Sequence, residues 1–156
     1  MIAVGADHGG VALKDALVAM LRERGAEVAD VGTSGSTSVD YPDFARLVAA
    51  RVSRREAERG ILVCTNGIGM AIAANKFPGV RAALVGDALG ARMAREHNDA
   101  NVLVLGGGMI GKVQARELLR IFLDTPFAGG RHQRRVDQIA ALERGLGLGR
   151  PAGALR

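Results

Sequence analysis

Cysteine and aromatic residues are scarce in this sequence, which contains one cysteine, no tryptophan and only 3% aromatic residues. A single cysteine cannot form an internal disulfide, so we expect a reducing compartment, the cytoplasm. No apolar run reaches the roughly 18 residues that a membrane-spanning helix needs, so no membrane partner is expected. Residues 1–4 enter an apolar segment with no basic stretch before it, which argues against a signal peptide.

The net charge of +5 is concentrated towards the end of the chain. Residues 131–156 hold six arginines and two acidic residues, whereas the other 130 residues hold fifteen basic and fourteen acidic ones. No aromatic side chain that could stack on a base lies in this basic segment. The pattern favours a small anion or a partner surface, and no nucleic acid, as the ligand.

With 48% hydrophobic and 24% charged residues, the chain of 156 residues has the composition and length of one globular domain. Five short apolar segments alternate with segments whose apolar residues recur at helical spacing. This alternation predicts an α/β fold with a single doubly wound five-stranded parallel sheet, Rossmann- or flavodoxin-like, and helices on both faces. We expect strands at 2–6, 27–31, 60–64, 80–85 and 102–105, a domain covering 1–145, and a flexible tail at 146–156.

The turn between the strand at 60–64 and a helix beginning near Gly67 contains the only cysteine, Cys64. Such a turn aims free backbone N–H groups and the positive end of a helix dipole at one point. A thiolate is favoured there and can act as a base or a nucleophile. The alternative role for a lone cysteine at a strand end is that of a small buried hydrophobic residue, and the glycines alone can mark a tight turn.

Ligands of a doubly wound sheet bind at the carboxyl ends of its strands. Asp7 and His8 follow the first strand and therefore meet Cys64 at that edge. His97 and Asn98 end a helix instead, which places them at the opposite edge of their own sheet. Because one chain then cannot bring both groups to one site, we expect a dimer with shared sites.

Arg131, Arg134 and Arg135 open the last expected helix, where cations oppose the helix dipole. They form either a solvated basic end or a binding site for an anion such as phosphate, which would pair with them in a bidentate manner. The three histidines and the cysteine lack the spacing of a zinc site, so no metal is expected.

Residues 106–111 match the Gly-x-Gly-x-x-Gly pattern of dinucleotide-binding turns, but only formally. The pattern follows the last strand rather than the first, and no acidic residue lies about 20 residues beyond it to bind a ribose hydroxyl. A tight turn with close helix packing is the other interpretation. A non-catalytic module that binds a nucleotide or a protein is therefore one hypothesis for the chain.

Several motifs occur in a defined order along the chain. They are Asp7-His8-Gly9-Gly10, Asp40-Tyr41-Pro42, Cys64 followed by Gly67-Ile68-Gly69-Met70, Ala73-Ala74-Asn75-Lys76, His97-Asn98-Asp99, Asn101-Val102-Leu103 and residues 129–135. In this order they resemble ribose-5-phosphate isomerase type B, in the family that includes galactose-6-phosphate isomerase subunits. The resemblance covers roughly residues 1–145.

The resemblance implies an aldose–ketose isomerase that interconverts ribose 5-phosphate and ribulose 5-phosphate without a cofactor, as a homodimer or a dimer of dimers. Cys64 would be the base that moves a proton between adjacent carbons, and the N–H groups of residues 65–69 can stabilise the enediolate oxyanion. His97 would help to open the sugar ring, and the arginines would hold the phosphate. The expected substrate-binding residues are Asp7, His8, Thr65, Asn66, Gly67, Ile68, Gly69, Asn98, Arg131 and Arg135.

The chain departs from that family's pattern at two places. The family usually has glycine and then threonine or serine after the cysteine, where this chain has Thr65 and Asn66. It usually has an arginine where this chain has Gly108, a charge that Arg134 could replace. Asn66 lacks a hydroxyl for proton relay, which Thr65 offers one position earlier. These departures favour, as an alternative, an isomerase of a four- or six-carbon sugar phosphate.

Overall fold

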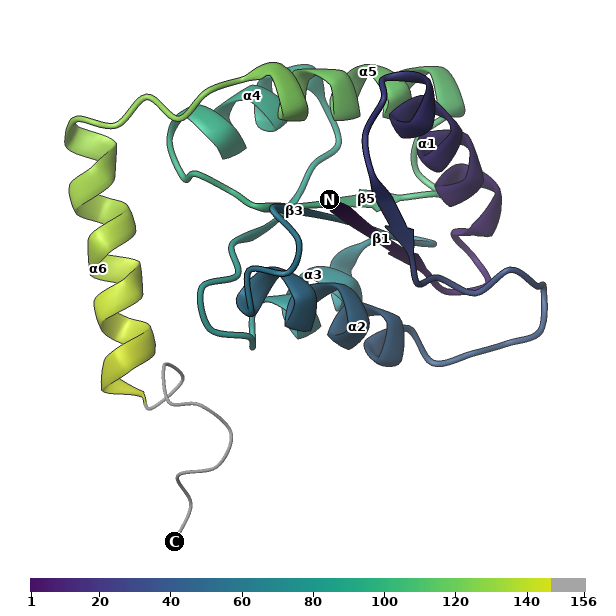
Figure 1. The fold of residues 1–156 in the computed structure, drawn as a ribbon, viewed down its shortest axis with the longest axis horizontal. Helices are drawn as coiled ribbons and strands as arrows, with labels where there is room; N and C mark the ends of the chain where they lie inside the picture. Colours follow the sequence, from purple (N-terminus) through teal and green to yellow (C-terminus); the bar gives the residue numbers. More distant parts are fainter. Residues whose placement is uncertain (147–156) are drawn as a thin grey trace, which may run out of the picture.

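The computed structural model describes residues 1–146, which form a parallel five-stranded sheet between two layers of helices (Figure 1). The strands are β1 (Ile2–Ala6), β2 (Val28–Asp30), β3 (Arg59–Cys64), β4 (Ala82–Leu84) and β5 (Val102–Gly106). They lie in the order β2-β1-β3-β5-β4. The predicted doubly wound sheet is confirmed, while β2 and β4 are shorter than expected. Each lies at an edge of the sheet, has one neighbour, and pairs with it over three residues.

The helices are α1 (Val11–Glu23), α2 (Tyr41–Ser53), α3 (Ile68–Ala74), α4 (Ala88–Glu96), α5 (Lys112–Asp124) and α6 (Arg131–Gly145). α1, α4 and α5 cover one face of the sheet, and α2 and α3 cover the other (Figure 1). No helix among residues 1–146 is both long and apolar enough to span a membrane. Of the predicted tail, residues 147–156 lie outside the described residues.

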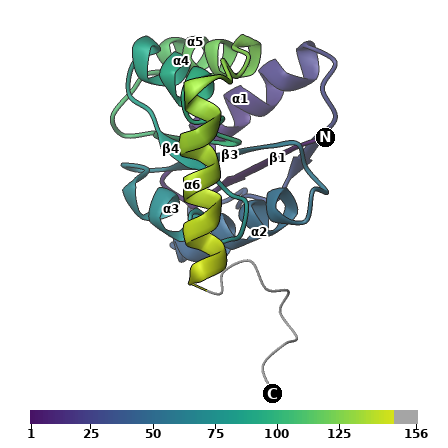
Figure 2. The same cartoon turned by 90° about the vertical axis from the view of Figure 1, so that its left-hand side faces the viewer.

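Helix α6 belongs to neither layer. Figure 2 shows it crossing in front of both layers, at one end of the strands. That end is the amino-terminal one. Helix α4 leads back to the start of β5, and the loop before α6 donates the Ala128 N–H to Glu96 O at the end of α4 (3.0 Å). Further along α6, Glu143 Oε2 accepts the N–H of Gly79, which precedes β4, at 3.0 Å.

Alternate residues of the central strands fill two cores, one on each face of the sheet. On β3, Ile61 and Val63 belong to one core, and Leu62 and Cys64 belong to the other. Phe122 of α5 is the one aromatic side chain among the buried residues of the described chain. The cores are therefore built from aliphatic side chains, as the scarcity of aromatic residues predicts.

Helix α1 approaches β3 so closely at its start that a side chain does not fit there. A Cβ on Gly10 would lie 2.5 Å from the carbonyl oxygen of Val63 and 3.0 Å from its Cγ1. The Gly10 N–H also closes a turn by donating to Asp7 O at 3.0 Å. This close approach sets residues 7–10 directly beside the end of β3, where Cys64 lies.

We expect Gly10→Ala to lower the free energy of unfolding by about 1–3 kcal/mol, because the added methyl group meets the backbone of β3 rather than a flexible side chain. Gly86→Ala is the matched control, since a Cβ there meets no neighbouring group within 4 Å. Urea unfolding followed by circular dichroism measures both variants. Equal stability of the two would contradict the close approach of α1 to β3.

Candidate active site

Asp7 and His8 follow β1 at the carboxyl edge of the sheet, and each side chain accepts a hydrogen bond from a backbone N–H group. Ala6 pairs with Val63 across the sheet, so the turn after β1 lies next to the turn after β3. The buried Asp7 carboxylate accepts the Gly9 N–H at 3.0 Å. His8 is exposed, and its Nδ1 accepts the Val39 N–H at 3.2 Å. His8 thereby ties the loop before α2 to the candidate site.

Cys64 ends β3, and its sulfur faces the beginning of α3. The residue is only 5% exposed, and Sγ accepts the backbone N–H of Gly67 at 3.1 Å. Gly67 precedes α3 and has a φ of +78°, a left-handed conformation that glycine adopts without strain. The structure thus places the thiol at a strand-to-helix turn, as predicted. In the single chain Cys64 is buried.

Two N–H groups of this turn already have partners within the chain. Besides the Gly67 N–H on the sulfur, the Ile68 N–H donates to Asn66 Oδ1 at 3.0 Å. The side-chain oxygen of Asn66 is thus turned back onto the start of α3. Of the predicted oxyanion-binding segment, Thr65 and Asn66 have exposed side chains, and Gly67 is buried.

The glycine-rich turn after β5 packs against the cysteine turn. The N–H groups of Gly107 and Gly108 donate to the carbonyl oxygens of Cys64 (2.7 Å) and Thr65 (2.8 Å). The next two N–H groups, of Met109 and Ile110, donate to Gly106 O at 2.9 and 3.2 Å. These four amides of the Gly-x-Gly-x-x-Gly segment are therefore engaged within the chain.

Tyr41 also lies at this edge, although it is not among the predicted site residues. Its half-exposed ring covers the first turn of α3, where a Cβ on Gly69 would overlap the ring. Asp40-Tyr41-Pro42 was one of the motifs carrying the family resemblance, so that motif was the available signal. The sequence alone did not show that the start of α2 would reach α3.

A second group of predicted site residues lies at the opposite edge of the sheet, where α4 ends and α6 begins. His97 follows α4, and its ring stacks on that of His132 with centroids 4.1 Å apart and planes 9° apart. His132 is in the first turn of α6, between Arg131 and Arg135, both of which are exposed. Among residues 1–146, neither arginine forms an ion pair with a carboxylate.

A partly buried network of charged side chains holds the chain around His97 and Asn98. Arg95 is buried, and its Nη1 contacts Asp99 Oδ1 at 2.8 Å and donates to Ala100 O at 2.6 Å. Arg81 pairs with the other oxygen of Asp99 at 2.9 Å and also donates to Asn98 O at 3.2 Å. Asp99 has a φ of +44°, so these bonds hold a left-handed bend directly after Asn98.

His132 is one of the three histidines of the sequence and is not among the predicted site residues. Its side chain is largely covered, with the residue 8% exposed. Burial, followed by the charges of His97 and the neighbouring arginines of α6, lowers the pKa of His132 below its ordinary value, and Glu96 opposes the shift. An anion bound to these arginines would counter only the part of the pKa shift that their positive charges cause.

The predicted site residues thus fall into two groups at opposite ends of the strands (Figure 1). Asp7, His8 and residues 64–69 form the carboxyl-edge group, while His97, Asn98 and the arginines of α6 form the amino-edge group. The single chain does not bring the two groups together. The protein therefore has a doubly wound α/β fold. Its only cysteine lies at the carboxyl edge of the sheet, where ligands of such folds bind.

The chain belongs to the ribose/galactose isomerase family, whose model matches residues 2–139. Ribose-5-phosphate isomerase B of Escherichia coli is 46% identical over 142 residues, which cover 91% of this chain and 95% of that protein. The resemblance carried by the motifs of the sequence is therefore confirmed.

Solved structures agree with this assignment. The chain is 48% identical to ribose-5-phosphate isomerase B of Clostridium thermocellum, with a TM-score of 0.91 and coverage of 93% of this chain and 98% of that one. It is 40% identical to ribose-5-phosphate isomerase B of Mycoplasma genitalium, with a TM-score of 0.89 and coverage of 92% and 95%. The Mycoplasma genitalium structure contains bound ribulose 5-phosphate.

The lowered pKa of His132 predicts a loss of stability in acid. Between the ordinary histidine pKa of 6.5 and the lower folded value, the unfolded chain binds a proton that the folded chain does not, so stability falls as the pH falls. From about pH 7.5 to about pH 5.5, the melting temperature of the wild type should drop more steeply than that of His132→Phe. Parallel profiles for wild type and His132→Phe would contradict the pKa shift.

Proposed function

We propose that this chain interconverts ribose 5-phosphate and ribulose 5-phosphate, with Cys64 as the base. Its membership of a family of sugar isomerases supports the proposal. The single structural observation that carries it is the contact between Cys64 Sγ and the Gly67 N–H, at the edge where ligands of such sheets bind. That contact aims the only thiol of the chain at the start of a helix, where an anionic sulfur is stabilised.

In the proposed reaction the thiolate removes the proton from C2 of the open-chain aldose. The electron pair of that C–H bond forms the C1–C2 double bond, and the carbonyl π electrons move to O1, giving an enediolate. The thiol then returns a proton to C1, the O2 hydroxyl passes its proton to O1, and C2 becomes the carbonyl carbon of the ketose. Backbone N–H groups near Cys64 are suited to stabilising the negative charge of the intermediate.

The remaining predicted roles belong to residues of the amino-edge group. His97 would open the sugar ring, Asn98 would contact the substrate, and Arg131 and Arg135 would bind the phosphate. We infer that this group comes from the partner subunit, because it lies at the far end of the sheet from Cys64 in its own chain. A homodimer, alone or within a dimer of dimers, would pair each carboxyl edge with the amino-edge group of the other subunit.

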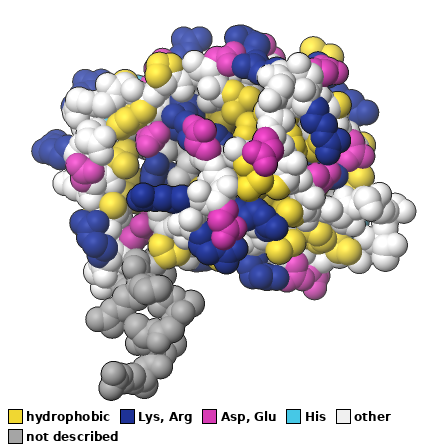
Figure 3. Space-filling model, in the orientation of Figure 1, with side chains coloured by type: hydrophobic (Ala, Val, Ile, Leu, Met, Phe, Trp, Pro, Cys, Tyr) yellow, Lys and Arg dark blue, Asp and Glu magenta, His cyan; other side chains and the backbone are white. Residues whose placement is uncertain are grey.

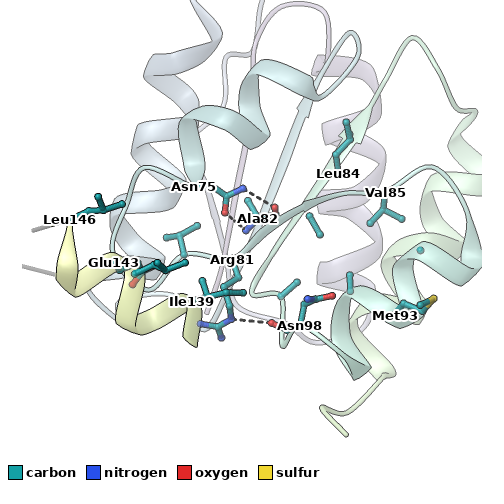
Figure 4. A pocket seen from close by; sticks show the side chains of 16 residues that line it. Asn75, Arg81, Ala82, Leu84, Val85, Met93, Asn98, Ile139, Glu143 and Leu146 are labelled. Atoms are coloured by element: carbon teal, nitrogen blue, oxygen red, sulfur yellow. Dashed lines mark hydrogen bonds between the residues drawn. The ribbon is translucent and has the colours of Figure 1, made fainter. Parts of the chain in front are cut away.

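An exposed apolar groove supports the same inference. It has a volume of about 520 Å³ and lies between α6 on one side and β4 and α4 on the other (Figure 4). Leu84 and Ile139, which line it, are 45% and 40% exposed, and Leu142 is 66% exposed. Contiguous exposed apolar surface of this kind is typical of an interface between subunits. We propose a second copy of the chain as its occupant.

The proposed ligand is a small sugar phosphate rather than a nucleic acid. On the face shown in Figure 3, Lys and Arg side chains are interspersed with Asp and Glu side chains and do not form one basic surface. A mixed surface does not follow a nucleic-acid backbone. We also propose the cytoplasm as the compartment, because a base that works as a thiolate must stay reduced.

We expect Cys64→Ser to lower kcat by about 10²- to 10⁴-fold, because a serine hydroxyl is a far weaker acid than a thiol and cannot supply the base. The substitution changes one atom, so the melting temperature should stay near that of the wild type. Coupled assays with ribose 5-phosphate and with ribulose 5-phosphate measure both directions. Retention of most of the activity by a folded Cys64→Ser variant would remove Cys64 as the base.

Shared sites predict that two inactive variants can restore each other. Cys64→Ser and the double variant Arg131→Ala/Arg135→Ala should each be inactive alone. Refolded together in equal amounts, they should recover about a quarter of wild-type activity, because about half of the dimers are mixed and each mixed dimer holds one intact site. The matched control is Cys64→Ser mixed with Asp7→Asn, which leaves no intact site. Mixed dimers that form, as seen by native mass spectrometry, but stay inactive would contradict shared sites.

A further inference from the structure

The amino-edge group is assembled from two segments that are far apart in the sequence. His97 and Asn98 follow α4, whereas Arg131 and Arg135 lie at the start of α6. If these side chains are to bind one ligand, the end of α4 must be held in a fixed position relative to α6. A buried side chain in the last turn of α4, that of Arg95, contacts the chain on both sides of this junction.

On the side of α4, Arg95 holds the bend that follows Asn98. Its Nη1 lies 2.8 Å from Asp99 Oδ1 and donates to Ala100 O at 2.6 Å. Asp99 has a φ of +44°, a left-handed conformation that is uncommon for a residue with a side chain. The bonds of Arg95 therefore stabilise a bend that the local chain does not favour by itself.

On the side of α6, the same guanidinium group reaches the start of the loop 125–130, which leads into that helix. Arg95 Nε donates to Thr125 O at 3.3 Å, and Cζ lies 5.7 Å from the centroid of the Phe122 ring in the last turn of α5. Arginine carries its N–H donors on three nitrogens in a rigid planar fork, whereas lysine carries its donors on one nitrogen. Arg95 can therefore bind acceptors on both segments at once.

We propose that Arg95 is a positioning residue of the active site, which aligns His97 and Asn98 with the arginines of α6. With the residue only 4% exposed, Arg95 acts through the segments that it holds and not by contact with the substrate. The alignment is visible in the stacking of His97 on His132, with ring centroids 4.1 Å apart. This inference rests on the proposed function, because that function gives the amino-edge group its roles.

The first test measures the alignment without using activity. Arg95→Lys keeps a positive charge beside Asp99 but has no second nitrogen that could donate to Thr125 O. Stacked imidazole rings shift each other's ring-proton signals, which ¹H–¹³C NMR of histidine-labelled protein detects. His97→Ala and His132→Ala assign the signals and give their unstacked positions. In Arg95→Lys, the signals of both histidines should move most of the way to these positions.

Arg120→Lys is the matched control, because Arg120 is a half-exposed arginine of α5 that pairs with Glu117. It should keep the wild-type histidine spectrum. Asp99→Asn weakens the same network from the acceptor side and should shift the signals in the same direction as Arg95→Lys, so it serves as a second variant. Wild-type histidine signals in a folded Arg95→Lys variant would overturn the proposal.

The second test asks which half of a shared site the substitution damages. Arg95→Lys should lower kcat/KM for ribose 5-phosphate by about 10- to 100-fold, as expected when reacting groups are displaced by about 1 Å. Refolded with Cys64→Ser, it should recover about a quarter of wild-type activity, because its own thiol is intact. Refolded with Arg131→Ala/Arg135→Ala, it should recover none, because both subunits then lack a working amino-edge group.

Wild-type kcat/KM in Arg95→Lys would overturn the proposal. When Cys64→Ser and the double arginine variant restore each other, a failure of Arg95→Lys to restore Cys64→Ser would overturn it too, because the damage would then reach the carboxyl edge. If Cys64→Ser and the double arginine variant do not restore each other, the shared site of the proposed function is overturned instead. The histidine signals decide the role of Arg95 in that case.

Discussion

The candidate site depends on how closely the backbone turns after β1, β3 and β5 approach one another. Gly10 lies against the carbonyl oxygen of Val63, and Gly107 donates its N–H to the carbonyl oxygen of Cys64 at 2.7 Å. The glycines allow the three turns to approach closely, and hydrogen bonds such as that of Gly107 satisfy backbone N–H and C=O groups where the turns meet. The sulfur of Cys64 is left to a single backbone donor, the Gly67 N–H.

The same topology that builds the carboxyl edge separates it from the basic residues. A parallel βα unit brings the chain back to the amino end of the sheet, so the residue after α4, His97, lies at that end. Helix α6 then adds its arginines and stacks His132 on His97. A substrate with a reactive carbonyl at one end and a phosphate at the other needs both groups, and a symmetric pair of chains is a simple way to join them.

Periodicity predicted the sheet well because the central strands β1, β3 and β5 are buried and the helices that cover the sheet each have one apolar face. The lengths of β2 and β4 were overestimated, because the number of paired residues at an edge depends on the neighbouring strand. The turn at Cys64 was predictable from local residues alone. The stacking of His97 on His132 was not predictable in this way, because it depends on the packing of α6 against the end of α4.

By itself, the sequence determined the fold class, the family and the position of the lone thiol at a strand end. These follow from local patterns of apolar residues, glycines and short motifs, which need no knowledge of distant contacts. Only the tertiary structure decided that Thr65 sits between Gly9 and Gly108, and that the arginines of α6 lie far from Cys64 in the same chain. Such relations arise when segments distant in sequence pack together, and the spacing of residues along the chain does not encode them directly.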